Sequence, residues 1–351
     1  MSEPAAEAAE AVPAGPVLSA PTEAVQAAPL LEAAGLVKVF PPRGGQPARK
    51  VVQGVDLQVS PGEVYGLMGL TAAGKSTLVG MLAGLLLPTA GSIRVSGAEA
   101  GPRQVRDSVA LALGTDHGFY DRLTVEDNLR FFGVLLGLEP AAAREKSREV
   151  IEMVGLQRAA DHAFLRLSSG QRRQIHLARA LLVKRPLLIA DEPTRGLDPA
   201  TEERIVKLLT RVKKTGQTML LVTHDVHLAS MLCDRIGILE SGQIIREGTP
   251  LELIHLLSAT RIFIRFHEKP WKCVKRFREM PWLTELHTHD FDVHLYTHDP
   301  EHDINDVVKI LVDVGTPVAD IDVPMPGLEE VFLKLVAERK HQQQAKEAGA
   351  D

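Results

Sequence analysis

The sequence predicts an α/β protein with a mixed, largely parallel β-sheet, a helical insertion and a small α+β domain at the C-terminal end. Apolar stretches typical of buried strands alternate with segments of helical periodicity, which favours a largely parallel sheet with helices on its faces. One such strand leads directly into a glycine-rich loop, and the helical pattern "STLVGMLAGLL" (76–86) follows. After about residue 250 the pattern changes to alternating strands and a helix, which is typical of an α+β unit.

Three strands of the main domain end in polar residues. They are "GEVYGLMG" (62–69), "RPLLIADEP" (185–193) and "TMLLVTHD" (218–225). Ligands of open α/β sheets bind outside the carboxyl ends of the strands, so we expect one site to collect the residues that follow these three strands.

Changes in pattern also give the expected domain boundaries. Residues 1–30 are rich in Ala, Pro and Glu and predict a disordered tail, and 339–351 predict another. The main domain is expected at 31–250 and the α+β domain at 251–338. Within the main domain, two amphipathic helices predict a helical insertion at about 118–164. In the first of these, one face carries Val125, Leu129, Phe132 and Leu136.

Composition excludes several classes of protein. The chain has 351 residues, of which 45% are hydrophobic and 24% charged, as in ordinary globular domains. Its net charge of −5 gives no general reason to expect nucleic acid as a partner. The two cysteines, Cys233 and Cys273, favour a reducing cytoplasm. Since no apolar stretch approaches the roughly 20 residues of a membrane span, we expect any membrane part to be another polypeptide.

The loop "GLTAAGKST" has the frame of a phosphate-binding loop. A strand, glycines and a helix start present backbone N–H groups to phosphate. Lys75 is expected to reach the β- and γ-phosphates, and Ser76 to offer its hydroxyl to Mg²⁺. A chance match is the alternative, and the flanking strand and helix argue against it. The predicted nucleotide contacts are Gly69, Leu70, Thr71, Ala72, Ala73, Gly74, Lys75, Ser76 and Thr77.

The acids that end the second strand fit the same chemistry. Asp191 is expected to hold the water shell of Mg²⁺, and Glu192 to polarise the attacking water. Phosphoryl transfer needs such positioning and charge neutralisation more than covalent help. A lone acidic pair at a strand end is often only exposed to solvent. Together with the phosphate loop, however, the pair predicts a nucleoside triphosphatase.

Two further stretches give a family resemblance. "LRLSSGQRRQIHLARALL" (165–182) and "LVTHD" (221–225) resemble the signature motif and switch histidine of ABC-type ATPases. The order of all motifs from Phe40 to His224 is similar to the nucleotide-binding domain of that family over roughly 31–250. The resemblance implies a P-loop NTPase fold, with ATP and Mg²⁺ as cofactors.

The resemblance also implies roles for individual residues. Phe40 would stack on adenine, although an ordinary core phenylalanine at a strand end is the alternative. Asp198 would lie at a dimer seam, and His224 would contact the γ-phosphate and hold Glu192 and water in line. The signature residues would face the ATP of a partner subunit, on a helix beginning near Gln171. They are Ser168, Ser169, Gly170 and Gln171.

Three positions depart from the family pattern. Ala72 and Ser169 stand where glycine is usual. Ala72 should weaken ATP binding only if its backbone needs a positive φ, in which case Ala72→Gly should tighten binding. The family's glutamine ahead of the helical insertion is replaced by Thr115, or by Asp116 in the other alignment. We expect altered coupling to the membrane partner rather than lost nucleotide binding.

The region after 250 resembles the ATPase subunits of two-component exporters, because "PGLEEVFLKL" (326–335) is similar to their ending. This implies a second ATPase subunit, as a homo- or heterodimer, and a membrane permease that docks on the insertion. No nucleic-acid partner is expected, and the chain would lie on the inner face of the membrane through its permease. A non-transport ATP switch acting on protein or nucleic acid is the alternative.

A histidine cluster stands in "HTHDFDVHLYTHDPEHD" (287–303). Histidines two residues apart share one face of a strand, and a hairpin could bring two pairs together as a Zn²⁺ or Ni²⁺ site. The alternative, which we favour, is a polar outer face of the α+β domain. The histidines are His287, His289, His294, His298 and His302.

Overall fold

The structure is a computed structural model of the chain, and its main feature is a six-stranded sheet that carries the predicted strands. The residues that it describes are 28–42, 47–113, 118–255, 260–297 and 299–323. The sheet has the order β10-β9-β3-β8-β7-β6, and every pairing is parallel except that of β9 with β10. The fold class expected for the main domain is therefore confirmed. The strands are β3 (Val64–Met68), β6 (Val109–Ala112), β7 (Leu187–Asp191), β8 (Thr218–Thr223), β9 (Arg235–Glu240) and β10 (Gln243–Gly248).

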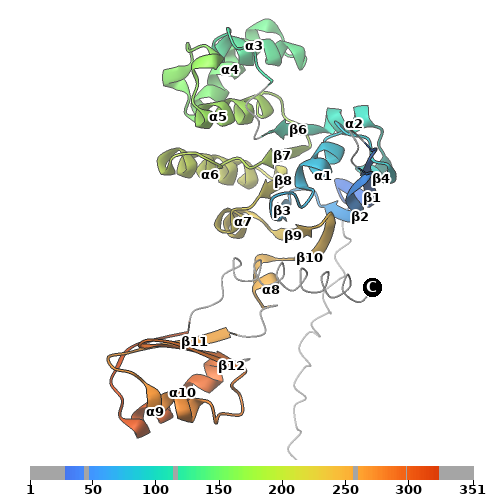
Figure 1. Cartoon of the computed structure of the whole chain (residues 1–351). Helices are drawn as coiled ribbons and strands as arrows, with labels where there is room; N and C mark the ends of the chain where they lie inside the picture. The colour runs from blue at the N-terminus through green and yellow to red at the C-terminus, as the bar shows by residue number, and fades with distance from the viewer. Residues whose placement is uncertain (1–27, 43–46, 114–117, 256–259, 298, 324–351) are drawn as a thin grey trace, which may run out of the picture.

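Hydrophobic cores fill both faces of this sheet. Because alternate strand residues point to opposite faces, Val64 and Met68 of β3 enter one core, while Tyr65 and Leu67 enter the other. The first core includes residues of α6 (Pro199–Lys214) and α7 (Val226–Leu232), and the second includes α1 (Lys75–Leu82). Figure 1 shows these helices on opposite sides of the sheet. The three strands that end in polar residues are thus rigidly held.

A second, four-stranded antiparallel sheet of order β2-β1-β4-β5 packs over α1 and was not predicted as a separate layer. It contributes the aromatic residue Phe40 at the last position of β1. Its strands are β1 (Leu31–Phe40), β2 (Arg49–Val59), β4 (Ala90–Val95) and β5 (Ala98–Glu99), and α2 (Pro102–Ser108) follows.

The predicted insertion is helical and forms one end of the molecule in Figure 1. It contains α3 (Val125–Leu135), α4 (Pro140–Val154) and two short 3-10 turns, Gln157–Ala159 and Phe164–Arg166, before α5 (Ser169–Ala180). The expected apolar face is largely confirmed, since Val125 and Leu129 are buried and Phe132 packs against the core. Leu136 lies just beyond α3 and is 39% exposed.

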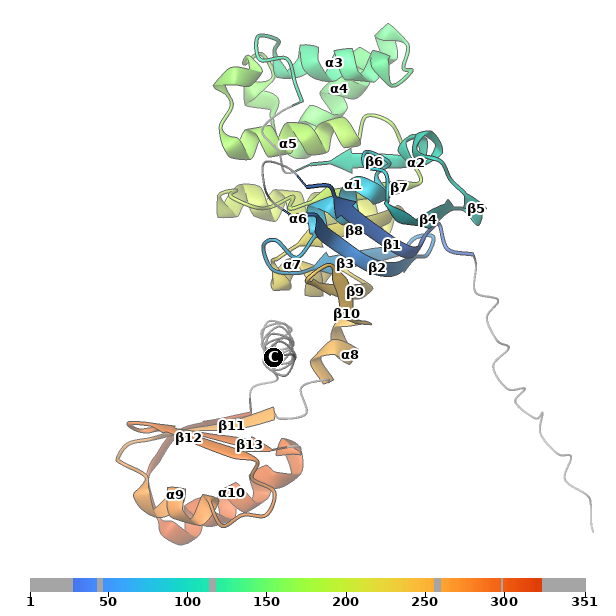
Figure 2. The same ribbon diagram turned by 45° about the vertical axis from the view of Figure 1, so that its right-hand side comes forward.

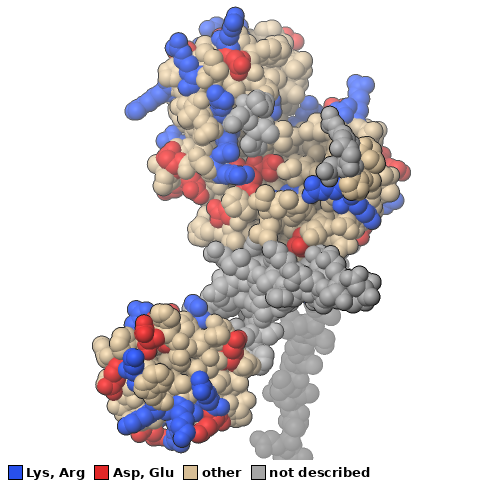
Figure 3. Space-filling model, viewed as in Figure 1, with Lys and Arg blue, Asp and Glu red and all other residues tan. Residues whose placement is uncertain are grey.

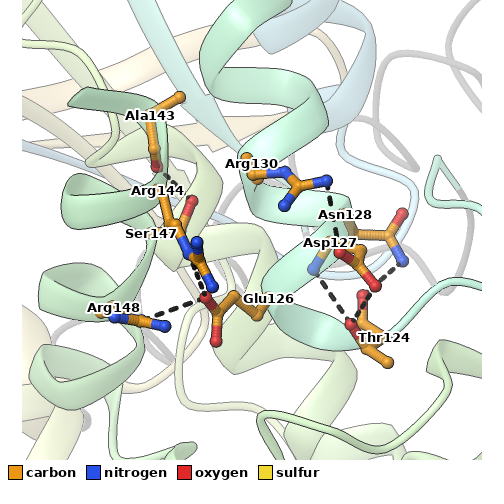
Figure 4. Close-up of polar contacts among 9 residues, drawn as sticks. All are labelled: Thr124, Glu126, Asp127, Asn128, Arg130, Ala143, Arg144, Ser147 and Arg148. Carbon is orange, nitrogen blue, oxygen red and sulfur yellow. Dashed lines mark hydrogen bonds and ion pairs between the residues drawn. The ribbon is translucent and has the colours of Figure 1, made fainter. Parts of the chain in front are cut away.

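Polar contacts hold α3 against its neighbours (Figure 4). The carboxylate of Glu126 on α3 accepts a hydrogen bond from Arg148 of α4 at 3.1 Å, and Arg144 lies 3.9 Å away. The side chain of Asn128 is fully buried, and its amide donates to the carbonyls of Tyr120, Leu123 and Thr124. These bonds tie the start of the insertion to α3, because a buried amide is costly to leave unpaired.

The C-terminal part has a β-α-β-β-α-β order and an antiparallel sheet of order β12-β13-β11-β14. This is the ferredoxin-like arrangement. It has its own hydrophobic core, and its helices lie together on one side of the sheet (Figure 2). An α+β unit was expected, but α9 was not. The elements are β11 (Thr260–Phe266), α9 (Trp271–Phe277), β12 (Glu285–His289), β13 (Asp292–Thr297), α10 (Pro300–Val314) and β14 (Val318–Asp322), joined to the main domain after α8 (Pro250–His255).

The histidine cluster falls mainly on the hairpin of β12 and β13. His287 and His294 are direct cross-strand partners. The ring of His287 packs edge-on to Tyr296, and the ring of His294 is tilted against Phe263. Within the described residues, no group of three or more His, Cys, Asp or Glu side chains is placed to hold a metal ion. His298 and the 326–335 ending lie outside the described residues. Among the described helices, none is long and apolar enough to cross a membrane.

Candidate functional site

The glycine-rich loop joins β3 to α1, and both of its glycines, Gly69 and Gly74, are required by close backbone contacts. A Cβ on Gly69 would lie 2.4 Å from the carbonyl oxygen of Leu239. A Cβ on Gly74 would lie 2.9 Å from the carbonyl oxygen of Val51, and Gly74 has a φ of 105°. Only glycine avoids both the contact and the backbone strain. The loop is therefore held tightly between β2 and the end of β9.

Ala72 has a φ of 67° and lies in the left-handed region. An L-residue there costs roughly 1–2 kcal/mol relative to the right-handed conformation. Ala72 therefore has the positive φ at which glycine would be favoured over alanine.

Lys75 begins α1 and turns its ammonium group back over the loop. Its Nζ donates to the carbonyl of Gly69 at 2.5 Å and to that of Leu70 at 3.1 Å. Partial burial lowers the pKa of Lys75, and the nearby carboxylates of Glu192 and Asp191 oppose this effect. The result is a positioned cation at the mouth of the loop.

Asp191 is the last residue of β7 and lies close to this cation. Burial and the neighbouring charge of Glu192 raise its pKa to about 6, although Lys75 and Arg195 act in the opposite direction. A carboxylate so far from its ordinary pKa in a cavity is a candidate for ion binding.

Glu192 has a φ of 50°, which is unusual for a residue with a side chain. Its backbone N–H donates to the carbonyl of Val222 on the adjacent strand β8 at 2.8 Å. This contact holds the strained backbone and turns the carboxylate toward the end of β8. There, the Nδ1 atom of His224 lies 2.8 and 2.7 Å from Oε1 and Oε2 of Glu192. Strain of this kind is common at functional sites.

These groups meet in one cavity of about 710 Å³. Phe40, at the end of β1, lines it and is 38% exposed, so it is not an ordinary core phenylalanine. The cavity brings together ten predicted site residues: Phe40, Thr71, Ala72, Gly74, Lys75, Ser76, Thr77, Asp191, Glu192 and His224. The remaining loop residues, Gly69, Leu70 and Ala73, support the loop without lining the cavity.

The signature residues lie on a separate cavity of about 590 Å³. Ser168, Gly170, Gln171 and Asp198 line it, and Ser169 lines neither cavity. The signature helix begins at Ser169, two residues before Gln171, and Ser168 caps it. The Ser168 hydroxyl accepts from the N–H of Gln171 at 3.2 Å, and the Gln171 side chain accepts from the N–H of Ser168 at 3.0 Å. This is a complete capping box.

Asp198 caps the next helix, α6. Its carboxylate accepts from the N–H of Thr201 at 3.0 Å, and hydrogen bonds from the side chain and backbone of Thr201 lower its pKa. Beneath the signature, a Cβ on Gly170 would lie 3.1 Å from Cδ2 of Leu197, so the signature rests on the segment that leads from Glu192 to Asp198. Thr115 and Asp116 lie outside the described residues.

Sequence reasoning missed three arginines that line the first cavity: Arg49, Arg173 and Arg195. Arg49 is the cross-strand partner of Phe40, and Arg195 follows Glu192 by three residues. The closeness of Arg195 to Glu192 in the sequence was a usable signal, whereas Arg49 is brought beside Phe40 only by the pairing of β1 with β2. Arg173 had no such signal, because it lies on the signature helix, which the resemblance assigns to the partner's nucleotide.

Comparison with known proteins agrees with this geometry. The family model described as ABC transporter matches residues 52–195. The Nod factor export ATP-binding protein I of Rhizobium sp. (strain N33) is 34% identical over 287 residues, which are 81% of this chain and 91% of that protein. The linearmycin resistance ATP-binding protein LnrL of Bacillus subtilis (strain 168) is 30% identical over 293 residues, which are 82% of this chain and 94% of that protein.

A solved structure is also similar. It is a dimeric post-hydrolysis state of the ATP-binding cassette MJ0796 bound to ADP and Pi. The match has a TM-score of 0.58 and 26% identity, and it covers 62% of this chain and 98% of that one.

Proposed function

The chain belongs to the family of ABC transporter ATP-binding proteins and is an ATPase, and from this premise we propose that it binds ATP with Mg²⁺ and drives export through a separate membrane subunit. One observation carries the ATPase proposal. A phosphate loop with its lysine shares a cavity with a carboxylate that is held by a histidine. The non-transport switch is not favoured, because the two relatives reported above are named for export and for drug resistance.

Each side chain of the cavity has a role in this proposal. The loop N–H groups and Lys75 bind the β- and γ-phosphates, and Phe40 contacts the adenine. Ser76 and Asp191 offer the hydroxyl and carboxylate oxygens that Mg²⁺ prefers, and both line the same cavity. When bound, Mg²⁺ neutralises charge on the phosphates.

Glu192 and His224 perform the hydrolytic step. Glu192 accepts a hydrogen bond from the attacking water and holds it in line with the γ-phosphate. His224 fixes the orientation of that carboxylate through Nδ1. In this proposal the other ring nitrogen, Nε2, contacts the γ-phosphate. Together, Glu192 and His224 position the attacking water and form no covalent bond with the phosphate.

The second cavity supports a composite site between two ATPase subunits. Ser168, Ser169, Gly170 and Gln171 stand at the N-terminal end of α5, where backbone N–H groups favour phosphate. We place the ATP of a partner subunit there, with Asp198 at the seam. The phosphate loop and the signature residues line two separate cavities, which supports the need for a second copy or a relative.

The insertion supports a membrane partner. Its α3 exposes large apolar side chains, among them Phe131 at 40% and Leu135 at 68% exposed. Beside α3, a cavity of about 220 Å³ is bordered by Phe132 and Leu136. Figure 3 shows Lys and Arg side chains projecting around this end of the molecule. Such a mixed apolar and basic rim suits a polypeptide partner.

From these assignments we propose the remaining organisation. The ATPase domain spans 31–250 with its insertion at about 118–164, and the accessory domain spans 251–338. The chain lies at the inner face of the membrane through its permease. Thr115 replaces the family's glutamine as the residue that reports the nucleotide to that permease, and Thr115→Gln should change transport-coupled ATPase if this is so.

Purification from the native cell with mild detergent tests the proposal. We expect a multi-span membrane protein to co-purify with the chain, and the complex to hydrolyse ATP in a Mg²⁺-dependent manner. Glu192→Gln should retain the complex and lower the rate of hydrolysis by at least about 10²-fold. Co-purification with nucleic acid or with soluble proteins alone would instead support the non-transport switch.

A further inference from the structure

We propose that Arg173 binds the γ-phosphate of the ATP held by its own subunit and so links that nucleotide to the signature helix. The inference rests on the proposed function, in which ATP occupies the 710 Å³ cavity. Arg173 would be a positioning residue that contacts the ATP of its own subunit. The first turn of the same helix, α5, is proposed to face the ATP of the partner subunit.

The position of Arg173 on α5 is the first observation. Ser168 and Gly170, at the start of this helix, line the signature cavity. Arg173, three residues after Gly170, lines the cavity that contains Lys75 and Glu192. One rigid helix therefore presents side chains to both nucleotide positions. A movement of α5 that follows one phosphate is transmitted to the other.

The surroundings of Arg173 are the second observation. Its Nε is buried and has no hydrogen-bond partner within the part of the chain that the structure describes. Its NH1 lies 3.0 Å from the place where a Cβ on Gly196 would be, so glycine leaves the guanidinium room. A buried donor without an acceptor carries a desolvation cost. An anion that enters the cavity would remove that cost.

The residues around Arg173 indicate which phosphate of the nucleotide it contacts. Gly196, next to the Arg173 guanidinium, lies four residues after Glu192, and Arg173 lines the same cavity as the paired Glu192 and His224. The proposed position of the nucleotide base is beside Phe40 and its cross-strand partner Arg49. Lys75 is held on the loop side by the carbonyls of Gly69 and Leu70. Arg173 therefore shares the cavity with the groups that are proposed to act on the terminal phosphate, Glu192, His224 and Lys75.

The chemistry of arginine fits this position. Its guanidinium is always charged and can grip two phosphate oxygens at once. ADP lacks the group that Arg173 would hold. The inference thus predicts that Arg173 distinguishes ATP from ADP, whereas a residue at the base end cannot.

The deciding experiment measures the affinities of the full chain for ATP and for ADP by calorimetry. We expect Arg173→Ala to weaken ATP binding by about tenfold, as for loss of one charge-assisted hydrogen bond. ADP binding should change by less than about twofold, within ordinary context effects. Arg49→Ala is the matched control, because it removes an arginine from the base end and should affect ATP and ADP equally. Arg173→Lys keeps the charge and should recover part of the ATP preference.

The link to the signature helix is tested in the hydrolysis-deficient Glu192→Gln background at saturating ATP. Chains that also carry Arg173→Ala should stay largely monomeric, while those that carry Arg49→Ala should form dimers. Equal losses of ATP and ADP affinity, or unchanged ATP affinity, would overturn the γ-phosphate contact. Equal dimerisation would overturn the link. If the wild-type chain bound no ATP, both the proposed function and this inference would fall.

Discussion

The Nδ1 atom of His224 lies 2.7 Å from Oε2 of Glu192 and 2.8 Å from its Oε1, so one ring nitrogen contacts both carboxylate oxygens. The two residues follow the adjacent strands β7 and β8, and the N–H of Glu192 is bonded to Val222 of β8. The sheet therefore holds the two side chains together, and this arrangement requires the strained, positive φ of Glu192. Its geometry leads to the first prediction.

Glu192→Gln should lower the rate of ATP hydrolysis by roughly 10²–10⁴-fold, as expected for loss of a general base. ATP binding should persist, because the loop and Lys75 are untouched. Phosphate release and equilibrium binding measure the two effects separately. Glu203→Gln is the control, since Glu203 lies exposed on α6 and pairs with Lys207. A Glu192→Gln enzyme with near wild-type turnover would contradict the assigned role.

Asp191 should make Mg²⁺ binding depend on pH. Its pKa is raised from the ordinary 3.8 to about 6, chiefly by burial, so the carboxyl gains a proton as the pH falls through about 6. Because Mg²⁺ needs the ionised form, apparent Mg²⁺ affinity in the presence of ATP should fall by up to about tenfold per pH unit below that value. Titrations of Mg²⁺ between pH 5 and 8 measure this effect.

Asp191→Asn separates this titration from that of the nucleotide itself. The variant should bind Mg²⁺ weakly and should lose the extra pH dependence below about 6, leaving only the part due to ATP. The same shift affects the stability of the chain without ligand. Since the folded-state pKa lies above the ordinary value, the folded chain holds more protons between the two values, and stability should rise as pH falls through about 6. Identical pH profiles for wild type and Asp191→Asn would argue against both statements.

Ala72→Gly should relieve backbone strain in the phosphate loop. Ala72 has a φ of 67°, and relief of roughly 1 kcal/mol, the lower end of the cost of that conformation, corresponds to about a fivefold gain in ATP affinity. Ala73→Gly is the matched control. Ala73 is buried and is not among the residues with positive φ, so glycine there relieves nothing and should lower stability. Calorimetric ATP binding by the two variants would show whether backbone strain at position 72 is responsible.

Part of this fold could be predicted from the sequence. Strands β3, β7 and β8 were predictable because each is a short apolar run, followed by the glycine-rich loop in β3 and by polar residues in β7 and β8. The site lies where these three strands end. The antiparallel sheet was not foreseen, since "LEAAGLVKV" in β1 has small residues and weak alternation. Helix α9, with seven residues, is too short for periodicity to show.

The arginines of the cavity mark a different limit. Arg172 and Arg173 are adjacent in the same helix, and sequence alone cannot say which of them turns inward. The structure separates them, because Arg172 donates to the carbonyls of Leu167 and Leu165 while Arg173 lines the nucleotide cavity. Side-chain direction on a helix depends on packing partners that are distant in the chain.

Ser168 combines two functions that mutation can separate. As the N-cap of α5 it accepts from the N–H of Gln171, and Ser168→Ala should cost about 1 kcal/mol of stability. Ser168→Asp keeps a capping oxygen and should keep stability near wild type. It also places a negative charge where the partner's γ-phosphate is proposed to lie. We therefore expect Ser168→Asp in the Glu192→Gln background to remain folded and bind ATP but to fail to dimerise by size-exclusion chromatography. A stable Ser168→Asp dimer with ATP would mean that the serine serves the helix alone.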